Sequence, residues 1–130
     1  GLNFADLNFK GVHAGHLFVV RIYSNRVEIT DLKTGVMRKD IRETRKAKKA
    51  LSEEQKHALK GKSKRFEKVT ATGKWHNLLV TVSEDQLSLE LDGEQVGSFS
   101  SSGIAHPTKQ MLRLSVPQNV VVDDVRLWKK

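Results

Sequence analysis

The chain has 130 residues, of which 38% are hydrophobic and 29% are charged, and this composition suits one globular domain over 1–130. No apolar run approaches the roughly 20 residues that a membrane-spanning helix needs. The absence of cysteine excludes disulfides, thiolate catalysis and cysteine-based zinc sites.

The formal net charge of +8 comes from one segment. Residues 38–68 contain 13 Lys or Arg and 5 Asp or Glu, whereas the rest of the chain contains 10 of each. Such a surplus either attracts an acidic polysaccharide or another anionic surface, or only keeps an exposed insertion solvated. Nucleic-acid binding is not expected, because Phe66 is the one aromatic residue there and no nucleic-acid fold signature is present.

The first predicted elements are two strands that form a hairpin. Residues 16–23 (HLFVVRIY) and 26–32 (RVEITDL) are rich in β-branched and aromatic side chains. Ser24 and Asn25 between them predict a tight turn. Residues 1–4 also begin directly in strand-like sequence.

Residues 40–64 interrupt the strand pattern and predict a short basic helical insertion. Ser52 and Gln55 have the spacing of a capping box, which begins a helix by bonding to its first free amides. Gly61 predicts its end. Because Ala58 and Leu59 are its main apolar contacts, we expect one or two helical turns on or beside the strands.

Five more strands are predicted after the insertion. Leu87, Leu89 and Leu91 alternate with polar residues, which is typical of a half-buried strand. Asp92-Gly93 favours a type I′ hairpin turn, because both residues tolerate positive φ. Closely spaced strands of this kind predict an all-β fold, an antiparallel β-sandwich of the jelly-roll type. The predicted strands are 75–82, 86–91, 94–99, 111–116 and 120–128.

Three of these segments also carry a family resemblance. The sequences GKWHNLLVTV (73–82), LELDGEQV (89–96) and VDDVRLW (122–128) resemble the closing half of concanavalin A-like lectin/glucanase domains, in particular bacterial domains related to 3-keto-disaccharide hydrolases. Residues 12–16 and 103–109 resemble segments of exported bacterial proteins of this kind. The resemblance covers 2–33 and 65–128.

The resemblance implies a carbohydrate-associated function and an exported protein, periplasmic or extracellular. Such jelly rolls contain more strands than are predicted here, so opening strands are expected either upstream of this chain or from a partner. Strand exchange or a homo-oligomer is therefore one expectation. The strand signature itself is shared by lectins, glycosidases and adhesion modules.

Glu90, Asp92 and Glu94 nearly match the carboxylate strand of retaining glucanases, in which alternation places two carboxylates on one sheet face. Gly93 argues against that interpretation, because Asp92-Gly93 is a better turn. No clear catalytic pair is predicted from these residues.

Three histidines are the other candidate cluster. His13 and His16 would face opposite ways in a straight strand, although Gly15 allows a bend that joins them. With His106 they would serve sugar binding, acid–base chemistry or structural hydrogen bonds. Their spacing is nonspecific for a metal, so neither a metal nor a cofactor is predicted.

We predict structural rather than ligand-binding roles for two tryptophans and for one pair of aspartates. Trp75 and Trp128 would stack on sugars or, as we predict, fill the core. Asp123 and Asp124 lack the dense loop of oxygen ligands that calcium requires.

The leading hypothesis is a carbohydrate-binding module of the lectin/glucanase type, with a glycan held on one sheet face. The alternatives are a glycoside hydrolase resembling the keto-disaccharide enzymes, and a protein interaction or assembly module. The predicted ligand-binding residues are His13, His16, Tyr23, His106 and Lys109.

Overall fold

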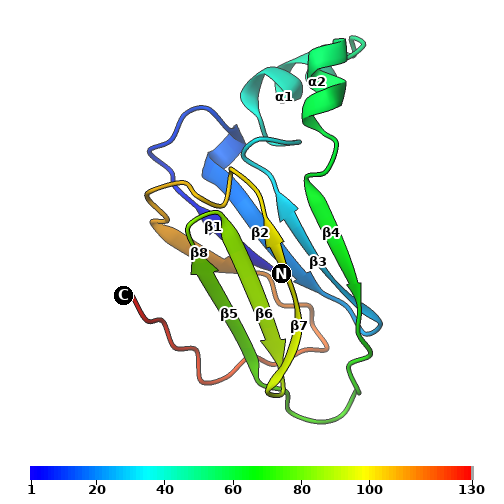
Figure 1. The fold of residues 1–130 in the computed structure, drawn as a ribbon, viewed down its shortest axis with the longest axis vertical. Coiled ribbons are helices and arrows are strands. Elements are labelled where there is room, and N and C mark those ends of the chain that lie inside the picture. Colours follow the sequence, from blue (N-terminus) through cyan, green and yellow to red (C-terminus); the bar gives the residue numbers. More distant parts are fainter. Residues whose placement is uncertain (130) are drawn as a thin grey trace.

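Two antiparallel sheets pack face to face in the computed structural model, which describes residues 1–129 (Figure 1). The larger sheet has the order β4-β3-β2-β1-β8, and its strands are β1 (Leu2–Ala5), β2 (His16–Ile22), β3 (Arg26–Asp31), β4 (Ser63–Glu67) and β8 (Met111–Leu114). The smaller sheet has the order β5-β6-β7, with β5 (Leu78–Ser83), β6 (Gln86–Leu91) and β7 (Glu94–Ser100). The predicted all-β sandwich is thus confirmed at the level of its two sheets.

The two predicted hairpins are present. In the first, the Tyr23 amide donates to the Arg26 carbonyl and closes the turn between β2 and β3. In the second, Asp92 and Gly93 have φ values of 53° and 80°, so both adopt the left-handed conformation that a type I′ turn requires. Asp92 therefore lies at a hairpin tip, which removes the alternation that the glucanase interpretation needs.

The core lies between the sheets and is built from their alternating side chains. Leu87 and Leu89 of β6 are fully buried against the larger sheet, as their spacing predicts. Phe4 and Phe18 stack across β1 and β2 with ring centroids 4.5 Å apart. The buried cluster consists of Leu17, Phe18, Val20, Val27, Ile29, Leu87, Leu89 and Ile104.

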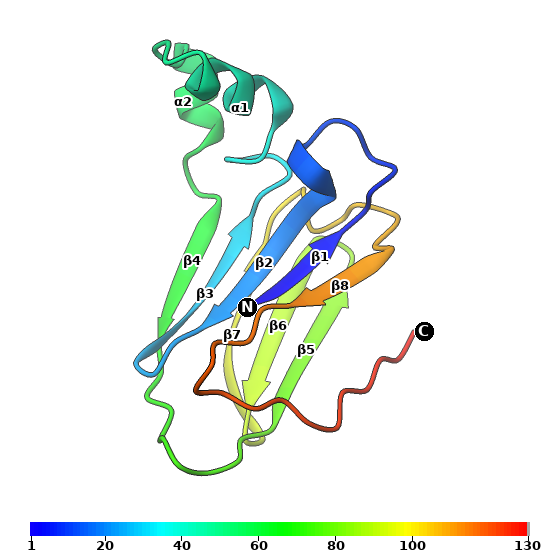
Figure 2. The ribbon, with the colours of Figure 1, turned by 180° about the vertical axis from the view of Figure 1, so that it is seen from behind.

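The basic insertion forms two helices beyond one end of the sandwich (Figures 1 and 2). Helix α2 (Glu53–Ala58) begins with the predicted capping box of Ser52 and Gln55. Helix α1 (Lys39–Lys46) was not predicted separately. The two are joined because the Arg38 guanidinium bonds to both Asp40 and Glu54, which lowers the pKa of each carboxyl group.

Three sequence predictions are wrong. Residues 120–128 form no strand in the structure. Trp75 and Trp128 do not fill the core, since they are 70% and 75% exposed. Strand β5 begins at Leu78 rather than 75, because the Asp92 carboxylate accepts hydrogen bonds from the Asn77 amide and the His76 ring and holds these residues in a loop.

Within residues 1–129, no helix has the length and apolar character that crossing a bilayer requires.

Candidate functional site

His13 and His16 are brought together by a tight bend before β2. A 3₁₀ turn, η1 (His13–Gly15), contains left-handed φ values at Ala14 and Gly15. The Gly15 carbonyl accepts from the Asp6 amide at 2.9 Å, and a Cβ at Gly15 would collide with the Asp6 backbone, so glycine is required there. The result is that the two imidazole rings lie 6.2 Å apart, instead of on opposite faces.

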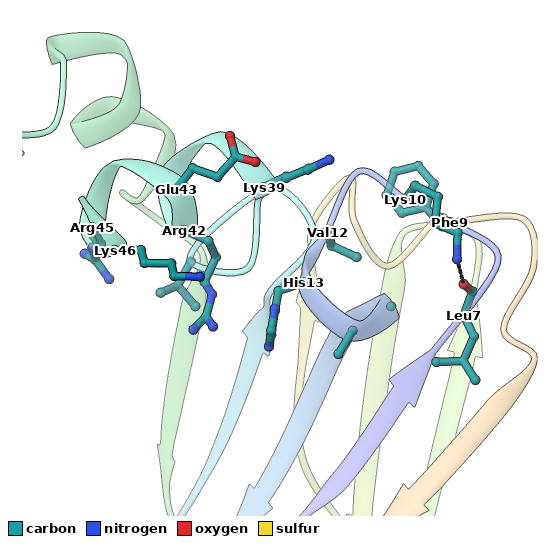
Figure 3. Close-up of a pocket in the computed structure, with 13 residues that line it drawn as sticks. Leu7, Phe9, Lys10, Val12, His13, Lys39, Arg42, Glu43, Arg45 and Lys46 are labelled. Carbon is teal, nitrogen blue, oxygen red and sulfur yellow. Dashed lines mark hydrogen bonds between the residues drawn. The ribbon is translucent and has the colours of Figure 1, made fainter. Parts of the chain in front are cut away.

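His13 lines an open pocket of about 970 Å³ between η1 and α1, here called the insertion hollow. Figure 3 shows the side chains of His13 and Arg42 pointing in the same direction from these two elements. Glu43 is the one acidic residue in its lining over residues 1–129. The basic or titratable residues around it are Lys10, His13, Lys39, Arg42, Arg45 and Lys46.

His16 lines a second open pocket, of about 460 Å³, on the outer face of the larger sheet. We call it the sheet hollow. Val19 of β2 and Met37 supply apolar lining. No acidic side chain from the described part of the chain lines it. Its polar side chains are those of Asn3, His16, Arg21, Tyr23, Arg113 and Ser115.

The His16 ring lies in a positive environment. Its pKa is lowered, first by burial and then by the positive charges of Arg113, His13 and Arg42. Nδ1 of His16 lies 3.0 Å from Oδ1 of Asn3, which fixes the orientation of the ring. The second nitrogen, Nε2, has no hydrogen bond within residues 1–129 and is therefore free for a ligand. This arrangement favours an anionic group.

Tyr23 lies at the rim of the sheet hollow and is 36% exposed. The Arg26 guanidinium stacks on its ring at 3.8 Å from the centroid. Arg26 is itself held by Glu28, with Nε 2.8 Å from Oε1. One face of the tyrosine is thus occupied by a cation, and the arginine orients the ring.

His106 and Lys109 lie outside both hollows. The His106 side chain is buried, and its Nε2 lies 3.0 Å from the Asp6 carboxylate. Lys109 donates to the His106 carbonyl at 2.6 Å. Of the five predicted ligand-binding residues, the structure therefore places His13 beside His16 and puts His16 and Tyr23 in one hollow. His106 and Lys109 instead form bonds within the fold.

Sequence reasoning missed the arginines of these hollows. Arg21 had no alternation to mark it, because the four residues before it in β2 are all apolar and all buried. Arg113 alternates with Leu112 and Leu114, which was a usable signal for an outward position. Its closeness to His16, like that of Arg42, had no signal, since it depends on the pairing of β8 with β1 and on the position of α1.

Two histidine–aspartate pairs resemble catalytic dyads but are engaged in the fold. Nδ1 of His76 lies 2.6 Å from Asp92, and Nε2 lies 2.6 Å from the Ala71 carbonyl. Both contacts raise the pKa of His76, the Asp92 bond most, so neither nitrogen is free to take a proton from a substrate. His106 is buried together with Asp6. Over residues 1–129 no group of three histidine, aspartate or glutamate side chains is placed to hold a metal.

Comparison with family models, with curated proteins and with solved structures gave no match for this chain.

Proposed function

We propose that this β-sandwich is a carbohydrate-binding module of the lectin type, and that it binds an acidic glycan on the outer face of the larger sheet. The observation that carries the proposal is the His13–His16 pair, which links two open hollows lined by cations. We further propose the concanavalin A-like form of the jelly roll and an exported location, on the sequence resemblance described above.

The chemistry of the two hollows supports a carboxylate- or sulfate-bearing sugar. Arginine presents paired donors that match the geometry of such groups. Arg42, Arg21 and Arg113 come from α1, β2 and β8, so they offer separated contacts rather than one point charge. His16 Nε2 and the Tyr23 hydroxyl add hydrogen-bonding groups for sugar hydroxyls.

Calorimetric titration with heparin, polygalacturonate and neutral dextran oligosaccharides tests the proposal. We expect binding of an acidic oligosaccharide that weakens as salt screens the charges, and none of dextran. The sulfated and carboxylated ligands distinguish the two acidic groups. Equal affinity for dextran, or no binding of either acidic ligand, would contradict the proposal.

Two pairs of matched variants test whether the ligand binds in the two hollows. Lys46→Gln removes a charge from the insertion hollow, and Lys60→Gln removes the same charge from a residue outside it. Arg113→Gln and Arg65→Gln form the second pair, since Arg65 lines neither hollow. We expect a loss of about tenfold for Arg113→Gln and a smaller loss for Lys46→Gln. Equal losses within each pair would indicate attraction by net charge alone.

A further inference from the structure

Three of the four sheet edges are protected from pairing with another strand, two by charged residues and one by a covering strand. Edge strand β4 contains Lys64, Arg65 and Glu67, and β8 contains Arg113. The β7 edge is covered from β4, because Lys64 donates to the Ser98 carbonyl and the Phe66 ring occupies the space above Gly97. Charged and covered edges are how proteins prevent edge-to-edge association.

The β5 edge has no such protection. Its sequence, LLVTVS, contains neither a charge nor a proline, and β6 is the one strand that pairs with it over residues 1–129. Leu79 points outward and is 43% exposed, while Leu78, Val80 and Val82 are only partly buried against the core. One side of β5 therefore presents free backbone groups beside an incompletely covered apolar face.

The smaller sheet has three strands and the larger one has five. Phe66 of β4 packs on Gly97 of β7, so β7 lies against the β4 side of the larger sheet, and β5 lies toward its β1 and β8 side (Figures 1 and 2). On β8, Leu112 pairs with Phe4 and faces inward with Leu114, which remains 40% exposed. Apolar side chains on this side of the sandwich are therefore incompletely covered.

The segment 120–128 has the side chains for that position. Val121 and Leu127 are 73% and 76% exposed. Asp124 has a φ of 54°, and a left-handed residue of this kind is compatible with a β-bulge, which shifts the side-chain alternation by one residue. With that shift, one face of the segment carries Val120, Val122, Val125 and Leu127.

A second copy of the chain can supply this segment antiparallel to β5, which is the orientation of all strand pairs in the two sheets. Within one chain, the segment runs past the β5 side toward the helical end of the molecule, the direction in which β5 itself points (Figures 1 and 2). Pairing in the same chain would thus be parallel, whereas all pairs in the two sheets are antiparallel. From a second copy the segment can approach β5 antiparallel.

We propose that this protein forms a strand-exchanged dimer, in which residues 120–128 of each copy add as a fourth strand to the β5 edge of the other. The exchange pairs backbone groups and covers apolar side chains that are exposed in the single chain. Pro117 lies between β8 and the exchanged segment and restricts the backbone of that connection.

Light scattering on the full chain, coupled to size-exclusion chromatography, tests the dimer. Leu79→Lys places a charge on the open edge, and Leu127→Asp places one on the exchanged segment, so each is expected to give monomer. Leu7→Lys is the matched control, because Leu7 is 42% exposed and lies on neither surface, and it is expected to remain dimeric. A monomeric wild-type chain, or a dimer that survives both Leu79→Lys and Leu127→Asp, would overturn the proposal.

Introduced cysteines distinguish exchange from pairing within one chain, since the protein has none of its own. Antiparallel addition places the start of the segment beside the end of β5. Oxidised Ser83→Cys/Val121→Cys protein is therefore expected to run as a covalent dimer on a nonreducing gel. A disulfide-bonded monomer, or no disulfide, would exclude the exchanged strand. Glycan binding by monomeric Leu79→Lys tests the proposed function separately.

Discussion

Nε2 of His106 lies 3.0 Å from Oδ2 of Asp6, although 100 residues separate the two in the sequence. Both side chains are buried. Asp6 additionally accepts from the Asn8 amide, so the pair fastens the segment after β7 to the loop between β1 and η1. Because that loop leads directly into η1, which begins at His13, the buried pair fixes the chain next to the proposed binding site.

The Asp6–His106 bond predicts a loss of stability in acid. The hydrogen bond from His106 is the main cause that lowers the pKa of Asp6. Its folded pKa lies below its unfolded value of about 3.9, so this stabilisation is present above pH of about 4 and is lost as the pH falls through the folded pKa. In urea unfolding, Asp6→Asn should therefore be less stable than wild type at neutral pH, with a difference that shrinks in acid. A constant difference would contradict this linkage.

Ligand binding should depend on pH through His16. Burial and neighbouring positive charges lower its pKa in the free protein. An anionic ligand favours the protonated ring and raises that pKa, so binding takes up a proton, and affinity increases as the pH falls through the ligand-bound pKa toward the lower pKa of the free protein. We expect a gain of up to about tenfold per pH unit for each proton taken up. Titration calorimetry at several pH values measures this gain.

The control for this pH dependence is a pair of substitutions. His16→Gln should flatten the profile, whereas His57→Gln should not, because His57 lies on α2 and lines neither hollow. Identical profiles for His16→Gln and wild type would assign the pH dependence to another group.

Substitution of Asp31 should lower the free energy of unfolding more than substitution of most other polar residues. Its buried carboxylate accepts hydrogen bonds from Thr34, the Ser101 hydroxyl and the Gly103 amide. Asp31→Ala leaves these donors without a partner, and we expect a loss of about 3 kcal/mol or more in the free energy of unfolding. Chemical denaturation measures it, and the exposed Asp123→Ala should change stability by no more than about 0.5 kcal/mol.

Gly103→Ala tests the same contact from the other side, since an added Cβ would collide with the Asp31 carboxylate. A variant as stable as wild type would show that the 101–105 loop is not fixed by Asp31.

The exposed position of Trp75 predicts a small effect of its removal. The indole is 70% exposed, so Trp75→Ala should cost no more than about 0.5 kcal/mol. Phe18 is fully buried and stacks on Phe4, and Phe18→Ala should cost about 3–5 kcal/mol. Denaturant unfolding of both variants compares them. If Trp75→Ala loses as much stability as Phe18→Ala, Trp75 packs in the core, as the sequence predicts.

The sequence by itself determined the features that depend on residues close together in the chain. The Asp92-Gly93 turn, the capping box at Ser52 and the burial of Leu87 and Leu89 each follow from local backbone geometry or from the two-residue period of a strand. The two-sheet architecture follows from repeating such local signals along the chain.

Only the tertiary structure decided which distant residues meet. The approach of Arg113 and Arg42 to His16, and of His106 to Asp6, depends on strand order and on the position of the insertion, which no local pattern encodes. Residues 120–128 show the same limit: their sequence is that of a strand, yet within residues 1–129 they pair with no strand. A strand forms only when another edge completes its hydrogen bonds.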